Sequence, residues 1–223
     1  MGAGNLKSLV VVIVTAIAGF ATLKGLTAVW RTRTVDRAAV EFGANADLGT
    51  LLARGWGIDA GTSALAAGLA IGGTLLVWSL AARESRRPIH LLAGFGVGAL
   101  VLAMWWTTGY LGHLAEHPET LEESWLATNS GRAEGLSFVA PTAYALDWLM
   151  FYSDASKRLT VGIVTVLGVV LGSAAVALAQ RSFRWEGFGG TGDLGHHLAG
   201  GVLVGVGGVT ALGCSIGGGI TGV

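Results

Sequence analysis

The residues with the clearest chemical potential lie in the glycine-rich stretch GGVLVGVGGVTALGCSIGGGITGV, which contains the single cysteine of the chain. Glycine costs a helix about 1 kcal/mol per residue relative to alanine, so we expect a helix break near Gly213. A broken helix in a membrane frees backbone N–H groups that can bind an anion. A thiol and a hydroxyl would lie in the same pocket. The expected binding residues are Cys214, Ser215, Gly213, Gly217, Gly218 and Gly219.

The same cysteine has a purely structural interpretation. A free cysteine behaves as a small buried hydrophobic residue, and the glycines around Cys214 could form a close packing face for another helix. Composition does not separate the two interpretations, so the ligand contact and the packing face both remain open at this point.

A second candidate segment, Arg184–His197 (RWEGFGGTGDLGHH), precedes the glycine-rich stretch. Arg184, with Glu186 beside it, is a candidate for the mouth of a pathway, because a guanidinium can hold an anion. The alternative is that Arg184 only anchors the chain on the cytoplasmic side. Asp193 or Thr191 could cap the helix that follows.

No catalytic, metal or cofactor site is expected. A chain with one cysteine cannot contain a CxxC metal site or an iron–sulfur cluster, and the P-loop pattern GxxxxGK[ST] is missing from the sequence. The histidines fall at expected membrane edges, where a solvated or capping role is the default, and metal or haem binding remains the minor alternative. They are His90, His113, His117, His196 and His197.

The elements that must position these residues are membrane helices. The chain is 52% hydrophobic and only 13% charged, with zero formal net charge. Soluble domains carry about 25% charged residues, so the composition indicates an all-α, polytopic membrane protein. No basic region with interleaved aromatic residues is present, so nucleic acid is not an expected partner.

Five segments are long and apolar enough to approach the roughly 20 residues that a spanning helix needs. The first also fits a signal peptide cleaved after Ala18. The last runs into the glycine-rich stretch and is expected to be broken or re-entrant. The five segments are Leu9–Trp30, Ala60–Ala82, Leu91–Tyr110, Leu159–Gln180 and His196–Gly213.

Charges in the connections predict the topology. The short loop with Arg83, Arg86 and Arg87 is expected in the cytoplasm, as are the arginines that follow the fourth segment. The acidic loop Leu111–Arg158 is then outside. By parity the loop Arg31–Asp59 is also outside, although its arginines partly violate the rule.

Two further features concern packing. The apolar stretch Leu136–Tyr152 contains Pro141 and Asp147 and is short for a span, so a re-entrant helix, an interfacial helix or a buried lid all fit. Small residues four apart predict close helix packing. These pairs are Gly68/Gly72, Gly94/Gly98, Gly168/Gly172 and Gly201/Gly205. Residues 1–223 are interpreted as a single membrane domain.

The segment from Arg184 to Val223 closely resembles the YeeE/YedE family of bacterial inner-membrane sulfur-transport proteins. The family motif GC-[TS]-[IV]-G-x-G-[LI]-[ST]-G is matched at every fixed position by Gly213–Gly222. The stretches GAGNLKSLVV and FVAPTAYALDWLMFYSDASKRLT also resemble the family, so the resemblance covers essentially the whole chain.

This resemblance implies uptake of thiosulfate or a related sulfur anion. Family members are helical proteins with internal pseudo-symmetry and short re-entrant helices, and cysteines at their waist pass the anion inward by S–H contacts. Some work beside a small cytoplasmic sulfur-carrier protein, and one branch is tied to selenium. The family carries several motif cysteines, whereas this chain has one, so the chain is expected to be truncated at both ends.

The leading hypothesis is therefore an inner-membrane transporter, not an enzyme, that passes a sulfur-containing anion by thiol S–H and backbone N–H contacts. The alternative is a sulfur- or selenium-handling membrane protein that forms a persulfide at Cys214 and passes the sulfur to a cytoplasmic carrier. A redox subunit using paired histidines and a fragment without function of its own are the remaining hypotheses.

Overall fold

The structure is a computed structural model that describes residues 2–38, 48–57, 59–82, 85–116, 121–154 and 156–211. It is mostly helical and contains almost no strand, which confirms the predicted all-α class. The main helices are α1 (Leu6–Lys24), α2 (Leu26–Thr34), α3 (Leu48–Trp56), α4 (Ala60–Ala81), α5 (Pro88–Trp106), α6 (Val139–Met150), α7 (Val161–Ala179) and α8 (Thr191–Thr210).

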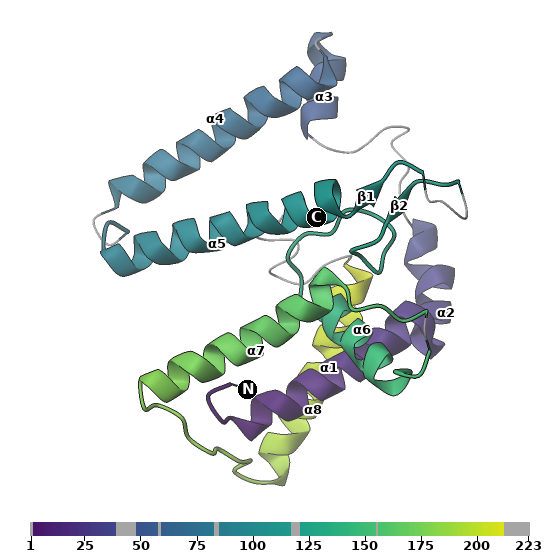
Figure 1. Cartoon of the computed structure of the whole chain (residues 1–223), viewed down its shortest axis with the longest axis vertical. Coiled ribbons are helices and arrows are strands. Elements are labelled where there is room, and N and C mark those ends of the chain that lie inside the picture. Colours follow the sequence, from purple (N-terminus) through teal and green to yellow (C-terminus); the bar gives the residue numbers. More distant parts are fainter. Residues whose placement is uncertain are drawn as a thin grey trace. The chain divides into compact units, whose positions relative to one another are not determined.

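The chain divides into two compact units (Figure 1). Unit 1 contains Met1–Arg37 and Leu100–Val223, and unit 2 contains Ala38–Ala99. The single membrane domain expected from the sequence remains a prediction. The candidate sites described below all lie within unit 1.

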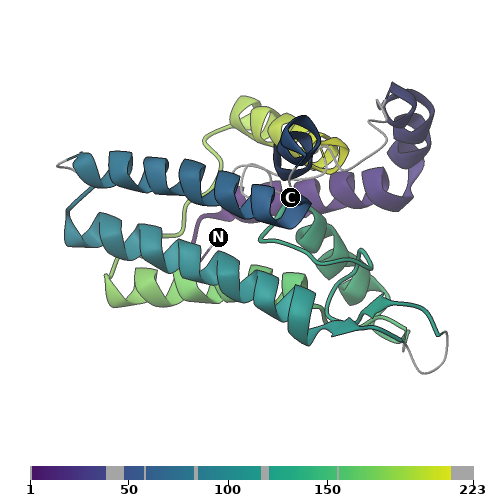
Figure 2. The same cartoon turned by 90° about the horizontal axis from the view of Figure 1, so that it is seen from above.

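The core of unit 1 is a close pair of parallel helices, α1 and α8, which lie side by side in Figures 1 and 2. Gly201 faces Val14, and Gly205 faces the backbone of Thr15. The Thr15 hydroxyl donates to the Gly201 carbonyl at 3.2 Å. The backbones of α1 and α8 can come this close because glycine has no side chain to hold them apart.

The first predicted span ends earlier than the sequence suggested. Leu9–Trp30 was expected to be one helix, but the structure breaks it at Gly25, whose backbone is extended at φ −108° and ψ −151°. The Gly25 N–H still donates to the Ala21 carbonyl at 2.9 Å, which closes α1. A Cβ at Gly25 would lie 2.8 Å from the Ala21 Cα atom, so only glycine fits this turn without a shift. The helix runs without a break through Ala18, which is buried against α8, and cleavage after Ala18 stays an untested alternative.

Helix α6 covers one side of this pair. It contacts α1 and α8 and buries Val139, Ala143 and Asp147. Pro141 falls in its first turn, where a missing N–H leaves no helical hydrogen bond unmade. With 12 residues, α6 is too short to cross a bilayer. The re-entrant placement of Leu136–Tyr152 remains a prediction.

The connection from α5 to α6 is anchored by a buried threonine. Helix α5 continues into a π-helical turn, η2 (Thr107–Leu111), and then a two-stranded antiparallel hairpin, β1 (His113–Leu114) and β2 (Ser124–Trp125). The Thr108 hydroxyl lies 3.0 Å from the Met104 carbonyl and 2.8 Å from the Glu134 carbonyl. Thr108 therefore ties the end of the helix to the following loop.

Unit 2 is built on the packing of α3 against α4. Gly49 sits where a Cβ would lie 2.5 Å from the Ala64 side chain. The Ser63 hydroxyl donates to the Gly49 carbonyl at 2.7 Å. Asp59 caps α4 by accepting from the N–H groups of Gly61 and Thr62.

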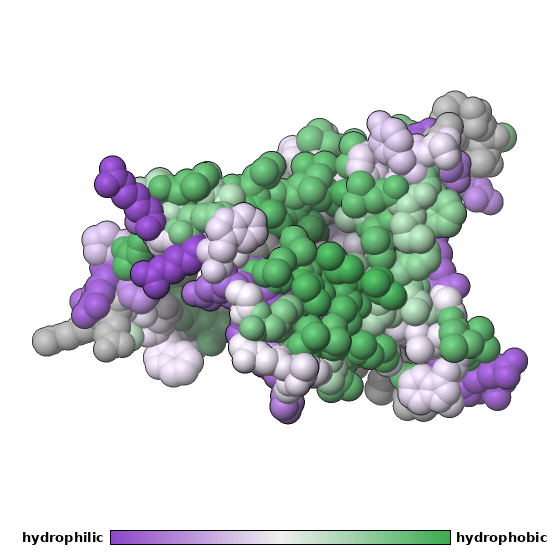
Figure 3. Space-filling view, turned by 90° about the horizontal axis from the view of Figure 1, so that it is seen from below, coloured by the Kyte–Doolittle hydropathy of each residue, from purple (hydrophilic) through white to green (hydrophobic). Residues whose placement is uncertain are grey.

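Four helices in the described part of the chain are long and apolar enough to cross a membrane: Leu6–Lys24, Ala60–Ala81, Pro88–Leu111 and Val161–Ala179. Their large apolar side chains are widely exposed, and Figure 3 shows broad apolar areas on the face that it draws. Trp105, Trp106 and Tyr110 are also exposed at one end of the third of these helices, as an interfacial belt requires. The protein is a multi-pass membrane protein.

The remaining expectations on spans and glycines are met in part. The fifth segment forms α8, a 20-residue helix that is not among the four candidate spans.

Of the small-residue pairs, Gly201/Gly205 packs as predicted. The other three pairs have open space beside each glycine in the described structure. Among the described residues, the predicted close packing is therefore not seen at these three pairs.

Candidate functional site

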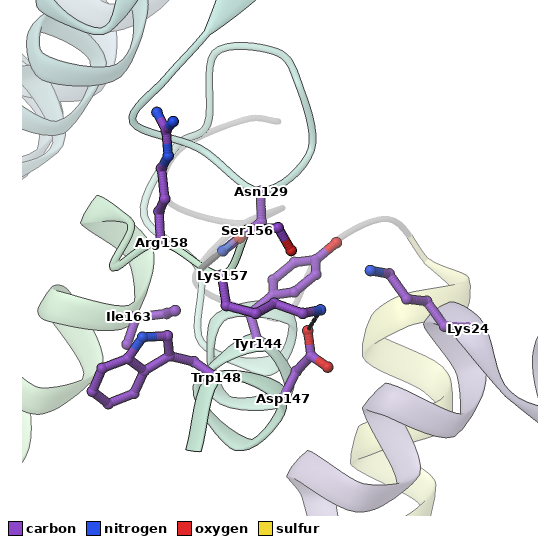
Figure 4. Close-up of a pocket in the computed structure, with 9 residues that line it drawn as sticks. All are labelled: Lys24, Asn129, Tyr144, Asp147, Trp148, Ser156, Lys157, Arg158 and Ile163. Atoms are coloured by element: carbon purple, nitrogen blue, oxygen red, sulfur yellow. Dashed lines mark hydrogen bonds and ion pairs between the residues drawn. The ribbon is translucent and has the colours of Figure 1, made fainter. Parts of the chain in front are cut away.

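A small polar cavity of about 180 Å³ opens at one end of unit 1 (Figure 4). It is formed where α1 ends, where α6 lies, and where the chain enters α7. The cavity is smaller than the roughly 300 Å³ at which pockets for drug-sized ligands begin, so it suits a small ion. Its lining residues are Lys24, Asn129, Tyr144, Asp147, Trp148, Ser156, Lys157, Arg158 and Ile163.

The position of α6 follows from small residues on α1. A Cβ at Gly19 would be in ordinary contact, 3.5 Å, with both Ala143 and Val139. Asp147 lies one turn beyond Ala143, on the same face of α6. Lys24, at the end of α1, is therefore brought to the side of α6 that carries Tyr144 and Asp147. The Lys24 ammonium lies 6.0 Å from the centre of the Tyr144 ring.

The cavity has an excess of positive charge. Three cations line it, Lys24, Lys157 and Arg158, against one carboxylate, Asp147. The Lys157 Nζ atom lies 2.5 Å from the Asp147 Oδ2 atom, and the Asp147 side chain is only 7% exposed. In Figure 4 the ammonium groups of Lys24 and Lys157 point toward the middle of the cavity, whereas the Arg158 guanidinium points away from it.

This arrangement can hold a small anion. Ammonium groups from two elements converge on one space, and Tyr144 and Asn129 place a hydroxyl and an amide at its wall. Charge-assisted hydrogen bonds to an anion are about twice as strong as neutral ones. Trp148 and Ile163 close the apolar side. No sequence motif indicates this cavity. Asp147 stands out only as a charge inside an apolar stretch, and such an isolated charge is a signal of function.

The predicted mouth residues Arg184 and Glu186 lie at the other end of unit 1. The backbone of Glu186 pairs with that of Asn5, and the Leu6 N–H donates to the Glu186 carbonyl at 3.0 Å. The Asn5 amide also donates to the Glu186 carboxylate at 3.3 Å. Along α1 this end is about 27 Å from Lys24, at 1.5 Å per residue.

A salt-bridge network joins the starts of α1 and α8 near this end. The Lys7 ammonium lies 2.8 Å from the Asp193 carboxylate, and His197 Nδ1 lies 3.1 Å from its other oxygen. The Asp193 carboxylate also accepts from the Gly189 N–H at 3.0 Å, which closes the first turn of α8 from within. The hydrogen bond from Lys7 and that from Gly189 lower the pKa of Asp193 below its usual value.

The expected anion-binding set, Cys214, Ser215, Gly213, Gly217, Gly218 and Gly219, lies outside the described residues. Helix α8 can be followed to Thr210, four residues before the cysteine. Near its end a Cβ at Gly208 would lie 2.8 Å from the Val139 side chain at the start of α6. The end of α8 therefore packs on the helix that carries the cavity residues.

The histidines in the described part of the chain do not form a metal site. No group of three or more histidine, cysteine, aspartate and glutamate side chains there could hold a metal ion. His113 pairs with Glu123 at 2.7 Å, and its ring contacts the Trp125 ring at a tilt of 46°. His196 and His197 each contact a backbone carbonyl four residues earlier in α8.

Comparison with known proteins gives two findings. A family model described as Sulphur transport matches residues 1–223. A curated relative, the thiosulfate transporter TsuA of Escherichia coli (strain K12), is 39% identical over 95 residues. That match covers 43% of this chain and 26% of the relative, so the chain matches about a quarter of the length of that protein.

Proposed function

The chain belongs to the Sulphur transport family, and from that premise we propose that it carries thiosulfate or a related sulfur-containing anion across the bacterial inner membrane. The observation that carries this proposal is the family match over the whole chain. The similarity to a thiosulfate transporter over 95 residues supports the choice of anion. The conclusion agrees with the function that the family resemblance of the sequence implied.

In this proposal the cavity at the end of α1 collects the anion. Positive charges in the loop after α7 favour a cytoplasmic position for the starts of α1 and α8, and in this proposal Lys24 then faces the outside. Lys24 and Lys157 then offer two ammonium groups to an anion that arrives from the outside. A partly enclosed site strengthens the attraction, because charges are less screened there than in water.

The glycine-rich motif after α8 would receive the anion next. The Cys214 S–H would contact its terminal sulfur, and Ser215 with the N–H groups of Gly217, Gly218 and Gly219 would contact its oxygens. Backbone N–H groups are suited to this task, because a full buried charge on the protein would cost several kcal/mol. Arg184 and Glu186 remain candidates for the cytoplasmic mouth.

A growth assay tests the proposal. Cells without thiosulfate uptake of their own, given this chain in its natural genomic context, should grow on thiosulfate as the sole sulfur source. Cys214→Ala should abolish that growth, while Gly172→Ala, a change beside open space in α7, should leave it intact. Equal growth of the two variants would remove Cys214 from the pathway.

The alternative, sulfur transfer to a cytoplasmic carrier through a persulfide, is distinguished by mass spectrometry. Pure transport leaves the mass of the peptide that contains Cys214 unchanged after exposure to thiosulfate. A gain of one sulfur atom on Cys214, with release of sulfite as the S–S bond of thiosulfate breaks, would instead favour the persulfide route and a small sulfur-carrier protein as partner.

A further inference from the structure

The proposed anion cavity already contains a negative charge of its own. Asp147 is the one carboxylate among its lining residues, and its side chain is only 7% exposed to solvent. Its partner is Lys157, at 2.5 Å. Within the described residues, neither Lys24 nor Arg158 forms a salt bridge.

A resident carboxylate must compete with any anion for the same cation. Lys157 cannot satisfy an incoming anion fully while its ammonium is bound to Asp147. An anion with a single charge gains little by displacing a carboxylate of equal charge. An anion with two charges can take Lys157 and also engage Lys24 across the cavity, so its attraction to the site is larger.

We propose that Asp147 is the selectivity residue of this cavity: it admits doubly charged sulfur oxyanions and excludes abundant single-charged anions such as chloride. The inference rests on the proposed function, because it assumes that the cavity receives the transported anion. When the anion leaves, Asp147 binds Lys157 again, and this return favours release toward the next site. Specificity then comes from two effects: Asp147 competes with the anion for Lys157, and the two ammonium groups attract the anion.

The local geometry suits this exchange. Lys157 lies in the irregular connection between α6 and α7, and its side chain is 26% exposed, so its ammonium, which already points into the cavity, can turn from Asp147 to an anion bound there. Asp147 is held by α6, whose neighbouring residues Ala143 and Thr142 are buried. The cation can therefore move while the carboxylate stays in place.

The test is equilibrium dialysis of purified full-length protein with ³⁵S-thiosulfate, at constant ionic strength, with chloride replacing gluconate. The wild type should bind thiosulfate with little competition from chloride. Asp147→Asn should bind thiosulfate at least about tenfold more tightly, and chloride should now compete. Asp59→Asn is the matched control, because this carboxylate caps α4 in unit 2, where asparagine caps equally well, and it should leave both properties unchanged.

The outcomes separate this inference from the proposed function. If Lys24→Gln and Lys157→Gln do not weaken thiosulfate binding, the anion does not use this cavity and the selectivity role of Asp147 is refuted with it, whereas thiosulfate transport itself, which rests on the family match, is decided by the growth assay. If those variants weaken binding but Asp147→Asn neither tightens it nor admits chloride, the selectivity role alone is refuted. Should Asp147→Asn fail to fold, the wild type still decides, because strong chloride competition there contradicts the inference.

Discussion

The contact between α1 and α8 lets us predict how strongly different glycine-to-alanine substitutions change the stability of the protein. A Cβ at Gly205 would lie 2.7 Å from the Thr15 carbonyl oxygen, 2.7 Å from the Ala18 Cβ and 2.9 Å from the Gly19 nitrogen. Two of these atoms belong to the backbone and cannot move aside without shifting α1. Gly205→Ala should therefore force the two helices apart, although alanine is the better helix former.

The magnitude follows from two opposing terms. Overpacking a tight interface costs about 1–3 kcal/mol. Replacing glycine by alanine within a helix gains about 1 kcal/mol when the new methyl group meets nothing. Gly172→Ala, beside open space in α7, gains only the second term. We therefore expect the free energy of unfolding of Gly205→Ala to be about 1–3 kcal/mol below that of Gly172→Ala.

The assay is reversible unfolding of the purified protein in mixed micelles with increasing denaturing detergent. Gly201→Ala should fall between the two variants, because its nearest neighbour is a Val14 methyl group at 3.1 Å, which can move. If Gly205→Ala is as stable as Gly172→Ala, the close parallel packing of α1 on α8 is wrong.

Two other predictions concern single polar contacts. Thr108→Val removes the hydroxyl that donates to the Glu134 carbonyl and should lower the free energy of unfolding by about 1–2 kcal/mol. Thr107→Val removes a hydroxyl that donates to the Ala103 carbonyl within its own helix, and it should lower the free energy of unfolding by less than half as much. Equal losses would contradict the anchoring role of Thr108. Asp193 lies in the first turn of α8, before the expected span, and its pKa is lowered in the folded protein. The ionised Asp193 carboxylate therefore stabilises the fold fully at pH values above its usual pKa of 3.8. This stabilisation is lost as the pH falls through the lower pKa of the folded state. Asp193→Asn should reduce the loss of stability in acid, measured as melting temperature against pH, and an unchanged acid profile would refute the network.

The sequence predicted the membrane class and the helices well, because long apolar runs leave few other structures in a bilayer. It also predicted close packing at Gly201 and Gly205. It did not predict the break at Gly25, since apolar residues continue past it and a single glycine is often tolerated within a helix.

The cavity could be predicted only in pieces. Asp147 stood out as a charge in an apolar stretch, and Lys24 is the one charged residue within the first predicted span, Leu9–Trp30. Their meeting depends on how α6 packs on α1, and the partner Lys157 comes from an irregular loop without a sequence motif. The mouth role of Arg184 and Glu186 stays a prediction. Their charges gave no sign that the Glu186 backbone pairs with Asn5 and Leu6.

The most direct test of the central claim is uptake of ³⁵S-thiosulfate by cells that lack their own thiosulfate uptake systems. The cells would carry this chain in its natural genomic context, either unchanged or with Cys214→Ala or Lys157→Gln. We predict uptake by the unchanged protein, none with Cys214→Ala, and a strongly raised KM with Lys157→Gln. Absence of uptake by the unchanged protein would contradict the assignment of thiosulfate as the transported anion.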